Sequence, residues 1–115
     1  MMLDYFINSG YYNNHPMNVY EDQDNLYLEL RATGVKKEDV SVKFENGILE
    51  INTTEENTEK PKYIRQEFRG DRYLGTKFEI PGEINSDGIE ANLDSGILKI
   101  KLPKDKSSSK LIEVK

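Results

Sequence analysis

Between residues 17 and 103, apolar and polar residues alternate in short segments, a pattern typical of half-buried β-strands. The clearest segment runs from Leu26 to Ala32, where every second residue is apolar. No segment repeats apolar residues at helical spacing, and Gly34 to Asp39 is predicted to form a turn with at most one helical turn. The pattern therefore predicts an all-β chain.

A β-hairpin is predicted at Asn46-Gly47, because both positions of a two-residue type I′ turn need a positive φ angle. A two-residue loop also fixes the register of the strands. One face of this hairpin is then apolar, and the other face sets a lysine opposite a glutamate, which is a favourable pair. The predicted pairs are Glu45 with Ile48, Phe44 with Leu49, Lys43 with Glu50 and Val42 with Ile51.

A second hairpin of the same kind is predicted at Ser95-Gly96. Its sequence Gly96 to Ile100, GILKI, nearly repeats the sequence GILEI of Gly47 to Ile51. Each hairpin buries one face, and two such faces packed together make an antiparallel β-sandwich. The predicted pairs are Leu93 with Leu98, Ala91 with Ile100, Ile89 with Leu102 and Glu90 with Lys101.

Between the two hairpins, residues 55 to 61 form a charged loop from which Tyr63 to Phe68 project as a possible strand. Thr76 to Ile80 is predicted as a short strand that Pro81-Gly82 ends. The segment from Tyr63 to Phe68 could equally be an ordinary strand within its own domain.

The carboxyl end carries a pair of apolar residues, Ile112 and Val114, behind a polar tether from Lys104 to Lys110. On an extended strand both side chains point the same way, and a terminus in solvent is usually polar throughout. Fully extended, the tether spans roughly 20 Å at about 3.3 Å per residue. Ile112 and Val114 are therefore expected to dock in a neighbouring subunit; the alternative is an edge strand of their own domain.

Residues 1–16 form an aromatic and asparagine-rich arm, expected to be flexible, without a clear period. The segment is too apolar for a plain solvated tail, so contact with client proteins or other subunits is expected. A disordered terminus and packing on its own sandwich are the alternatives. The apolar residues of this arm are Leu3, Tyr5, Phe6, Ile7, Tyr11 and Tyr12.

Length and composition limit the functions that the chain could have. Its 115 residues suffice for one domain with a modest core. A net charge of −5 argues against binding to nucleic acid. No segment approaches the length of a membrane span and no signal peptide is recognised, so a cytoplasmic location is expected.

The chain offers no familiar catalytic or metal site. There is no cysteine, and His15 is the single histidine, so neither a catalytic triad nor a transition-metal cluster of familiar type is expected. Asp22 to Asn25 resembles the start of a calcium loop, but Tyr27 stands where the sixth-position glycine belongs and Thr33 where the glutamate belongs. We expect no enzyme activity, no metal and no cofactor, although a carboxylate pair for glycoside chemistry remains an open alternative.

Several segments resemble the small heat-shock protein family, which contains an α-crystallin-type domain. Residues 91–104 resemble its signature of an alanine, a Gly-aliphatic-Leu turn and a strand that ends in proline. Residues 34–40 resemble its Gly-Val-x-x-Glu-Asp-Ile loop, and residues 78–81 resemble its aromatic-x-Leu-Pro motif. Residues 112–114 resemble its C-terminal Ile-x-Ile/Val anchor, so the motifs follow one another in the family's order from about Met17 to Val114.

This resemblance implies an immunoglobulin-like antiparallel β-sandwich over residues 17–103, a tether and anchor over 104–115, and an ATP-independent holdase that assembles from dimers into larger homo-oligomers. It implies that partners exchange a dimer strand, here Tyr63, Ile64, Arg65, Gln66, Glu67 and Phe68. It also implies that the anchor, Ile112 and Val114, enters a groove formed by Val42, Phe44, Ile89 and Ala91.

The sequence departs from the family pattern at three places. Thr33 stands before Gly34 where the family usually has proline, and Thr76 stands where it usually has arginine. The segment Gly70-Asp71-Arg72 adds a residue. Two other functions with the same fold stay open: a monomeric module like the co-chaperones related to α-crystallin domains, and a purely structural oligomer.

Overall fold

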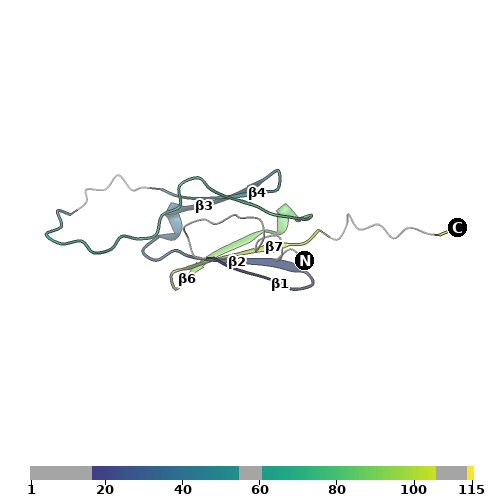
Figure 1. Cartoon of the computed structure of the whole chain (residues 1–115), viewed down its shortest axis with the longest axis horizontal. Coiled ribbons are helices and arrows are strands. Elements are labelled where there is room, and N and C mark those ends of the chain that lie inside the picture. The colour runs from purple at the N-terminus through teal and green to yellow at the C-terminus, as the bar shows by residue number, and fades with distance from the viewer. Residues whose placement is uncertain (1–16, 55–60, 106–113) are drawn as a thin grey trace.

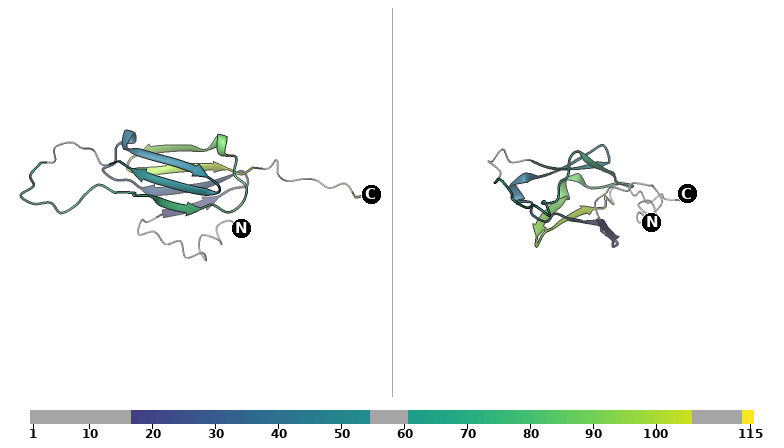
Figure 2. Two further views of the ribbon diagram at one scale, coloured as in Figure 1. Left: turned by 90° about the horizontal axis from the view of Figure 1, so that it is seen from above. Right: turned by 60° about the vertical axis from the view of Figure 1, so that its left-hand side comes forward.

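The computed structural model describes residues 17–54, 61–105 and 114–115, and its strands form two antiparallel sheets packed face to face (Figures 1 and 2). The four-stranded sheet has the order β1-β2-β7-β6, and the three-stranded sheet has the order β3-β4-β5. The predicted all-β, immunoglobulin-like sandwich is confirmed. The elements are β1 Met17–Glu21, β2 Asn25–Arg31, η1 Lys37–Asp39, β3 Val40–Glu45, β4 Ile48–Thr53, β5 Thr76–Glu79, η2 Ser86–Gly88, β6 Glu90–Asp94 and β7 Ile97–Pro103.

Both predicted hairpins form, and each belongs to a different sheet. Asn46 and Gly47 have φ angles of 53° and 77°, and Ser95 and Gly96 have φ angles of 51° and 75°, as a type I′ turn needs. The ladder of the first hairpin has the predicted register throughout. The second ladder also has the predicted register but begins at Glu90, so Ile89 lies just before it.

On the polar face of the first hairpin, Lys43 has its predicted partner across the strands and a closer one on its own strand. Lys43 lies opposite Glu50 in the register, yet its ammonium Nζ pairs with Glu45 Oε2 at 3.0 Å, two residues along the same strand. The hydrogen bond to Glu45, followed by the charge of that carboxylate, raises the pKa of Lys43. Glu50 instead accepts a hydrogen bond at 2.8 Å from the Nδ2 of Asn52. Residues two apart on a strand share a face, so both arrangements satisfy the same pattern.

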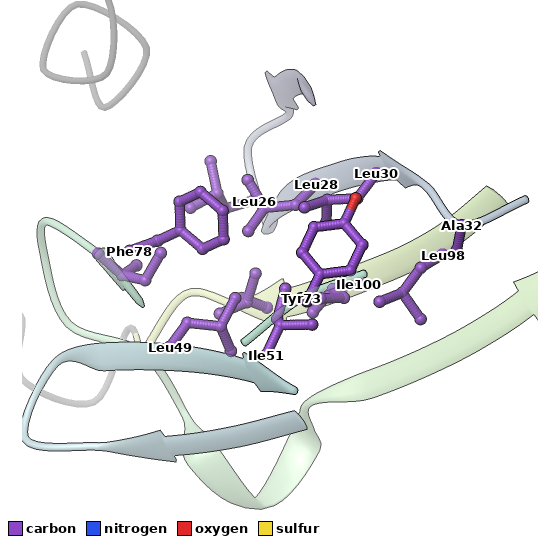
Figure 3. Packing of buried hydrophobic residues seen from close by; sticks show 12 residues of the cluster. Leu26, Leu28, Leu30, Ala32, Leu49, Ile51, Tyr73, Phe78, Leu98 and Ile100 are labelled. Carbon is purple, nitrogen blue, oxygen red and sulfur yellow. The ribbon is translucent and has the colours of Figure 1, made fainter. Parts of the chain in front are cut away.

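The core lies between the sheets and is built from the apolar face of each strand (Figure 3). Strand β2 contributes three fully buried leucines, and the hairpins add aliphatic side chains from β4 and β7. Three core residues lie outside the strands: Ala32 and Ile80 directly follow β2 and β5, and Tyr73 comes from the segment before β5. The buried apolar residues are Leu26, Leu28, Leu30, Ala32, Leu49, Ile51, Tyr73, Phe78, Ile80, Leu98, Ile100 and Leu102.

The segment from Tyr63 to Phe68 is not a strand in this single chain, so the alternative of an ordinary in-domain strand is wrong, while its exchange between partners stays a prediction. A strand is defined by hydrogen bonds to a neighbour, and no described strand of the same chain pairs with this segment. The short strand after it, β5, forms as expected but ends at Glu79 rather than Ile80.

Candidate assembly surfaces

The first candidate surface is a groove between the two sheets, where edge strand β3 lies across from edge strand β6. An edge strand has no neighbour on one side, so the inward side chains of these strands are only half covered. The groove has a volume of about 340 Å³. It is lined by Lys37, Val40, Val42, Ala91, Asn92, Leu93 and Leu98.

This groove overlaps only partly with the predicted set of residues. Val42 and Ala91 line it, whereas Phe44 and Ile89, which are half-buried as Val42 is, are not among its lining residues. The sequence reasoning missed Val40 and Leu93, which follow the same alternation two residues away from Val42 and Ala91, so the strand period could have found them. That this groove accepts the tail stays a prediction.

The second candidate surface is the projecting loop before β5, which extends beyond one end of the sandwich (Figure 1). Ile64 is 105% exposed and Phe68 is 85% exposed, and Tyr63 and Leu74 are also exposed. Clusters of large exposed apolar side chains mark interaction surfaces in stable proteins. Between them, Arg65 Nε donates to Glu67 Oε1 at 3.0 Å.

A hollow of about 520 Å³ lies between the projecting loop and the end of the sandwich. The loop contributes Tyr63, Gln66 and Phe68 to its wall, and the sandwich contributes Gly34 and Thr54 among others. The loop therefore does not pack tightly on its own domain, and its apolar side chains stay available for another chain.

The returning end of this loop is bonded firmly to β2. The Tyr73 hydroxyl donates to the carbonyl oxygen of Arg31 at 2.6 Å, and its backbone N–H donates to Thr53 Oγ1 at 3.0 Å. Burial, with the negative charge of Asp71 as a second cause, raises the pKa of the Tyr73 phenol to about 12. The buried phenol therefore stays neutral well above its ordinary range.

The point from which the tail leaves the domain is also well anchored. Lys104 Nζ lies 3.2 Å from Glu21 Oε2 and donates to the Asp22 carbonyl oxygen at 2.7 Å. The backbone N–H of Lys104 donates to the Asp24 carbonyl oxygen at 2.9 Å, and that of Asp105 donates to Glu83 at 2.9 Å. The chain after Pro103 is thus held beside the turn that joins β1 and β2.

In that turn, Asp22, the first residue of the segment that resembles a calcium loop, has a structural role. The Asp22 carboxylate accepts hydrogen bonds from the N–H groups of Asn25 at 2.7 Å and Asp24 at 2.8 Å, and from the Tyr27 hydroxyl at 2.9 Å. These bonds, that of Asn25 first, lower the pKa of Asp22. The carboxylate caps a turn, a role that aspartate commonly performs.

Several predicted residues lie outside the described part of the chain. Ile112 is one of them, whereas Val114 is described and is 93% exposed. The expected client-binding residues also lie outside the described ranges, namely Leu3, Tyr5, Phe6, Ile7, Tyr11 and Tyr12.

Within residues 17–54, 61–105 and 114–115, no three histidine, cysteine, aspartate or glutamate side chains are grouped so that they could hold a metal ion. The same residues contain no helix with the length and apolar character needed to cross a membrane.

Comparison with known proteins agrees with this geometry. Residues 18–115 match the model of the Hsp20/alpha crystallin family. Heat shock protein 16 of Schizosaccharomyces pombe is 35% identical over 99 residues, which cover 82% of this chain and 69% of that protein.

Solved structures of small heat-shock proteins have the same fold as this chain. Heat shock protein 16.0 from Schizosaccharomyces pombe superposes with a TM-score of 0.66 and 28% identity, covering 90% of this chain and 98% of that one. A small heat-shock protein from Xylella fastidiosa superposes with a TM-score of 0.64 and 25% identity, covering 88% of this chain and 95% of that one. The chain therefore belongs to the Hsp20/alpha crystallin family, the small heat-shock proteins, a family of chaperones.

Proposed function

We propose that this protein is an ATP-independent holdase that binds partly unfolded proteins and assembles from dimers into larger homo-oligomers. The observation that carries the proposal is that one chain leaves two apolar surfaces uncovered among its described residues. These surfaces are the groove between β3 and β6 and the projecting loop around Ile64 and Phe68. The groove is large enough to receive a short apolar segment, and the loop exposes apolar side chains that a second chain could cover.

The groove is the proposed receptor for the tail of another subunit. In an extended conformation Ile112 and Val114 would lie on one side of the tail, and the groove offers aliphatic side chains from both of its edge strands. Burying two aliphatic side chains yields about 3–5 kcal/mol at best, since each contributes about 1.5–3 kcal/mol. Such a contact is weak alone, and many of them in a closed shell give avidity.

The loop is the proposed source of the dimer. In this single chain the segment from Tyr63 to Phe68 has no strand partner among the described residues, and each sheet presents unpaired edges. Adding the segment to an edge strand of a second chain would satisfy its backbone groups and place Ile64 and Phe68 on the same face of that sheet. A reciprocal exchange of this kind closes into a two-fold dimer.

Clients are proposed to bind by reversible apolar contact, in part through the aromatic residues of the arm formed by residues 1–16. A protein that binds unfolded or molten chains competes with their aggregation by mass action, so no nucleotide is needed. We propose a cytoplasmic location; because one relative is a chloroplastic protein, cell fractionation is the direct test.

The test of assembly compares the native chain with the double variant Ile112→Ala/Val114→Ala by light scattering of the protein itself. We expect the double variant to shrink to dimers while its circular dichroism stays that of a β-sandwich. The matched control is Lys110→Ala/Glu113→Ala, which alters the same tail without removing an apolar residue and should keep the native mass. An unchanged mass of the first variant would refute docking of the tail.

The test of holdase activity measures light scattering of a heat-aggregating client protein without nucleotide. We expect the native chain to suppress aggregation, and a chain trimmed of residues 1–11 to suppress it less while unfolding at nearly the same urea concentration. Assembly without suppression would indicate a structural oligomer, and a native monomer would indicate an interaction module. Equal suppression by the trimmed chain would rule out the arm as client surface.

A further inference from the structure

The two ends of the projecting loop are fastened to the sandwich by separate sets of hydrogen bonds. At the outgoing end, the N–H of Thr54 donates to the Asp39 carbonyl oxygen at 2.8 Å, and its hydroxyl lies 3.2 Å from Asp39 Oδ1. At the returning end, the N–H of Thr33 donates to Asp71 Oδ2 at 2.8 Å, and the N–H of Asp71 donates to the Thr33 carbonyl oxygen at 2.8 Å. Residues 61–70 therefore project from two fixed points.

The returning end is the more tightly built of the two. The Asp71 side chain is only 14% exposed, and both of its oxygens also lie 3.3 Å from Arg31 Nε. Next to it, the backbone at Gly70 lies so close to Gly34 that a Cβ atom added to Gly70 would be 3.0 Å from the Gly34 carbonyl oxygen. Backbone and carboxylate thus hold the loop against the end of β2.

We propose that Asp71 is a positioning residue for dimerisation, because its reciprocal bond with Thr33 fixes the direction in which Tyr63 to Phe68 leave the domain. This inference rests on the proposed exchange of that segment between partners. A segment held in its binding orientation loses less conformational freedom on association than a freely moving one. Asp71 therefore strengthens the dimer without touching the partner chain.

The turn at Thr33 offers a way to remove the bond while the fold is kept. The N–H of Val35 donates to the Ala32 carbonyl oxygen at 3.3 Å, and Gly34 has a φ angle of +77°. This places Thr33 at the second position of a type II turn, where proline is favoured and the turn itself uses no N–H. The one bond that Thr33→Pro removes from the described structure is its N–H donation to Asp71.

The experiment measures the dimer dissociation constant of the full chain by sedimentation over a dilution series, for Asp71→Ala, Thr33→Pro and the double variant. We expect each single variant to weaken the dimer by about tenfold or more, because the freed segment must then lose its conformational freedom when the dimer forms. The double variant should be no weaker than Asp71→Ala, because both changes remove one shared interaction. Thr33→Pro should stay folded and should lose less stability in urea than Asp71→Ala, because proline restricts the unfolded chain and so offsets part of the loss of the hydrogen bond.

Two further variants give the controls. Asp71→Asn keeps an oxygen that can accept from Thr33, so its dissociation constant should stay within about threefold of the native value. Arg31→Ala removes a side chain that is 57% exposed and should also have little effect. Native-state amide exchange should show a protected Thr33 N–H in the native chain and a faster one in Asp71→Ala.

Ile64→Asp separates this inference from the proposed exchange of the loop. If Ile64→Asp leaves the dimer intact, the exchange is wrong and the role of Asp71 falls with it. If Ile64→Asp dissociates the dimer but Asp71→Ala and Thr33→Pro do not weaken it, Asp71 has no positioning role and the exchange stands. Loss of dimer together with loss of fold in Thr33→Pro would also overturn the inference, because the effect would then be structural.

Discussion

The substitution Tyr73→Phe tests whether the buried phenol anchors the loop to β2. The ring is 1% exposed and packs among the core side chains, and phenylalanine keeps that packing (Figure 3). What the substitution removes is the hydroxyl that donates to the Arg31 carbonyl oxygen at 2.6 Å. Loss of one such bond, with its acceptor left partly buried, costs about 1–2 kcal/mol at neutral pH.

Ionisation of the Tyr73 phenol should also change the stability of the fold. The pKa of Tyr73 is raised from 10.0 to about 12 in the folded state, first by burial and then by the charge of Asp71. A raised pKa means that the folded state favours the protonated form, so this contribution is complete below pH 10 and is lost as the pH rises through about 12. The loss is about 3 kcal/mol at most, since one pKa unit corresponds to about 1.4 kcal/mol and the pKa rises by about two units.

The assay is urea unfolding of the native chain and Tyr73→Phe at one protomer concentration, because assembly makes stability depend on concentration. We expect the native chain to be more stable by about 1–2 kcal/mol at pH 7. In a thermal melt, each kcal/mol of this difference should appear as about 4–8 °C in Tm for a domain of this size. The difference should shrink between pH 10 and 12. Equal stability at pH 7, or a difference that does not change up to pH 12, would refute the reasoning.

Three further predictions concern the sandwich. Leu49→Ala should destabilise the fold by about 2–5 kcal/mol in urea unfolding because the side chain is fully buried, whereas Ile48→Ala, on the opposite face, should change it by less than about 1 kcal/mol. Asp22→Ala should lower the Tm at pH 7, because the hydrogen bonds that lower the pKa of Asp22 stabilise the fold while its carboxylate is ionised. The Tm difference between the native chain and the variant should vanish as the pH falls below 3.8 and through the lower pKa of Asp22 in the folded state. Lys104→Ala should lower the free energy of unfolding by about 1–3 kcal/mol, since it leaves the nearly buried carboxylate of Glu21 without its cation. Salt screens such a pair only weakly, so an equal loss of stability in the native chain at 1 M salt would contradict this.

Local patterns predicted both hairpins and the strands β2 and β5, but not the separate strand β1. Alternation of apolar residues marks which face of a strand is buried, and Asn46-Gly47 and Ser95-Gly96 each specify a two-residue turn and hence a register. These signals act over a few residues, so they do not depend on where the rest of the chain lies. The motifs in residues 34–40, 78–81 and 91–104 likewise indicated the family before any fold was known.

The groove shows where local pattern stops being sufficient. Val42 and Ala91 were predicted as its walls together with Phe44 and Ile89, but the lining in the structure includes Val40 and Leu93 and does not include Phe44 or Ile89. Which inward side chain of an edge strand stays accessible depends on how far the two sheets overlap, and that overlap is set by packing between residues distant in sequence.

The anchoring of the projecting loop was decided by tertiary structure alone. No local signal predicts that Tyr73 enters the core, or that Asp71 bonds to Thr33, a residue 38 positions earlier. A strand period or a turn type constrains neighbours along the chain, whereas these contacts arise only when packing of the sheets brings the end of β2 beside the segment before β5. Sequence thus determined the elements and the family, and three-dimensional packing determined which polar groups hold the loop in place, because hydrogen bonds form between groups that are close in space.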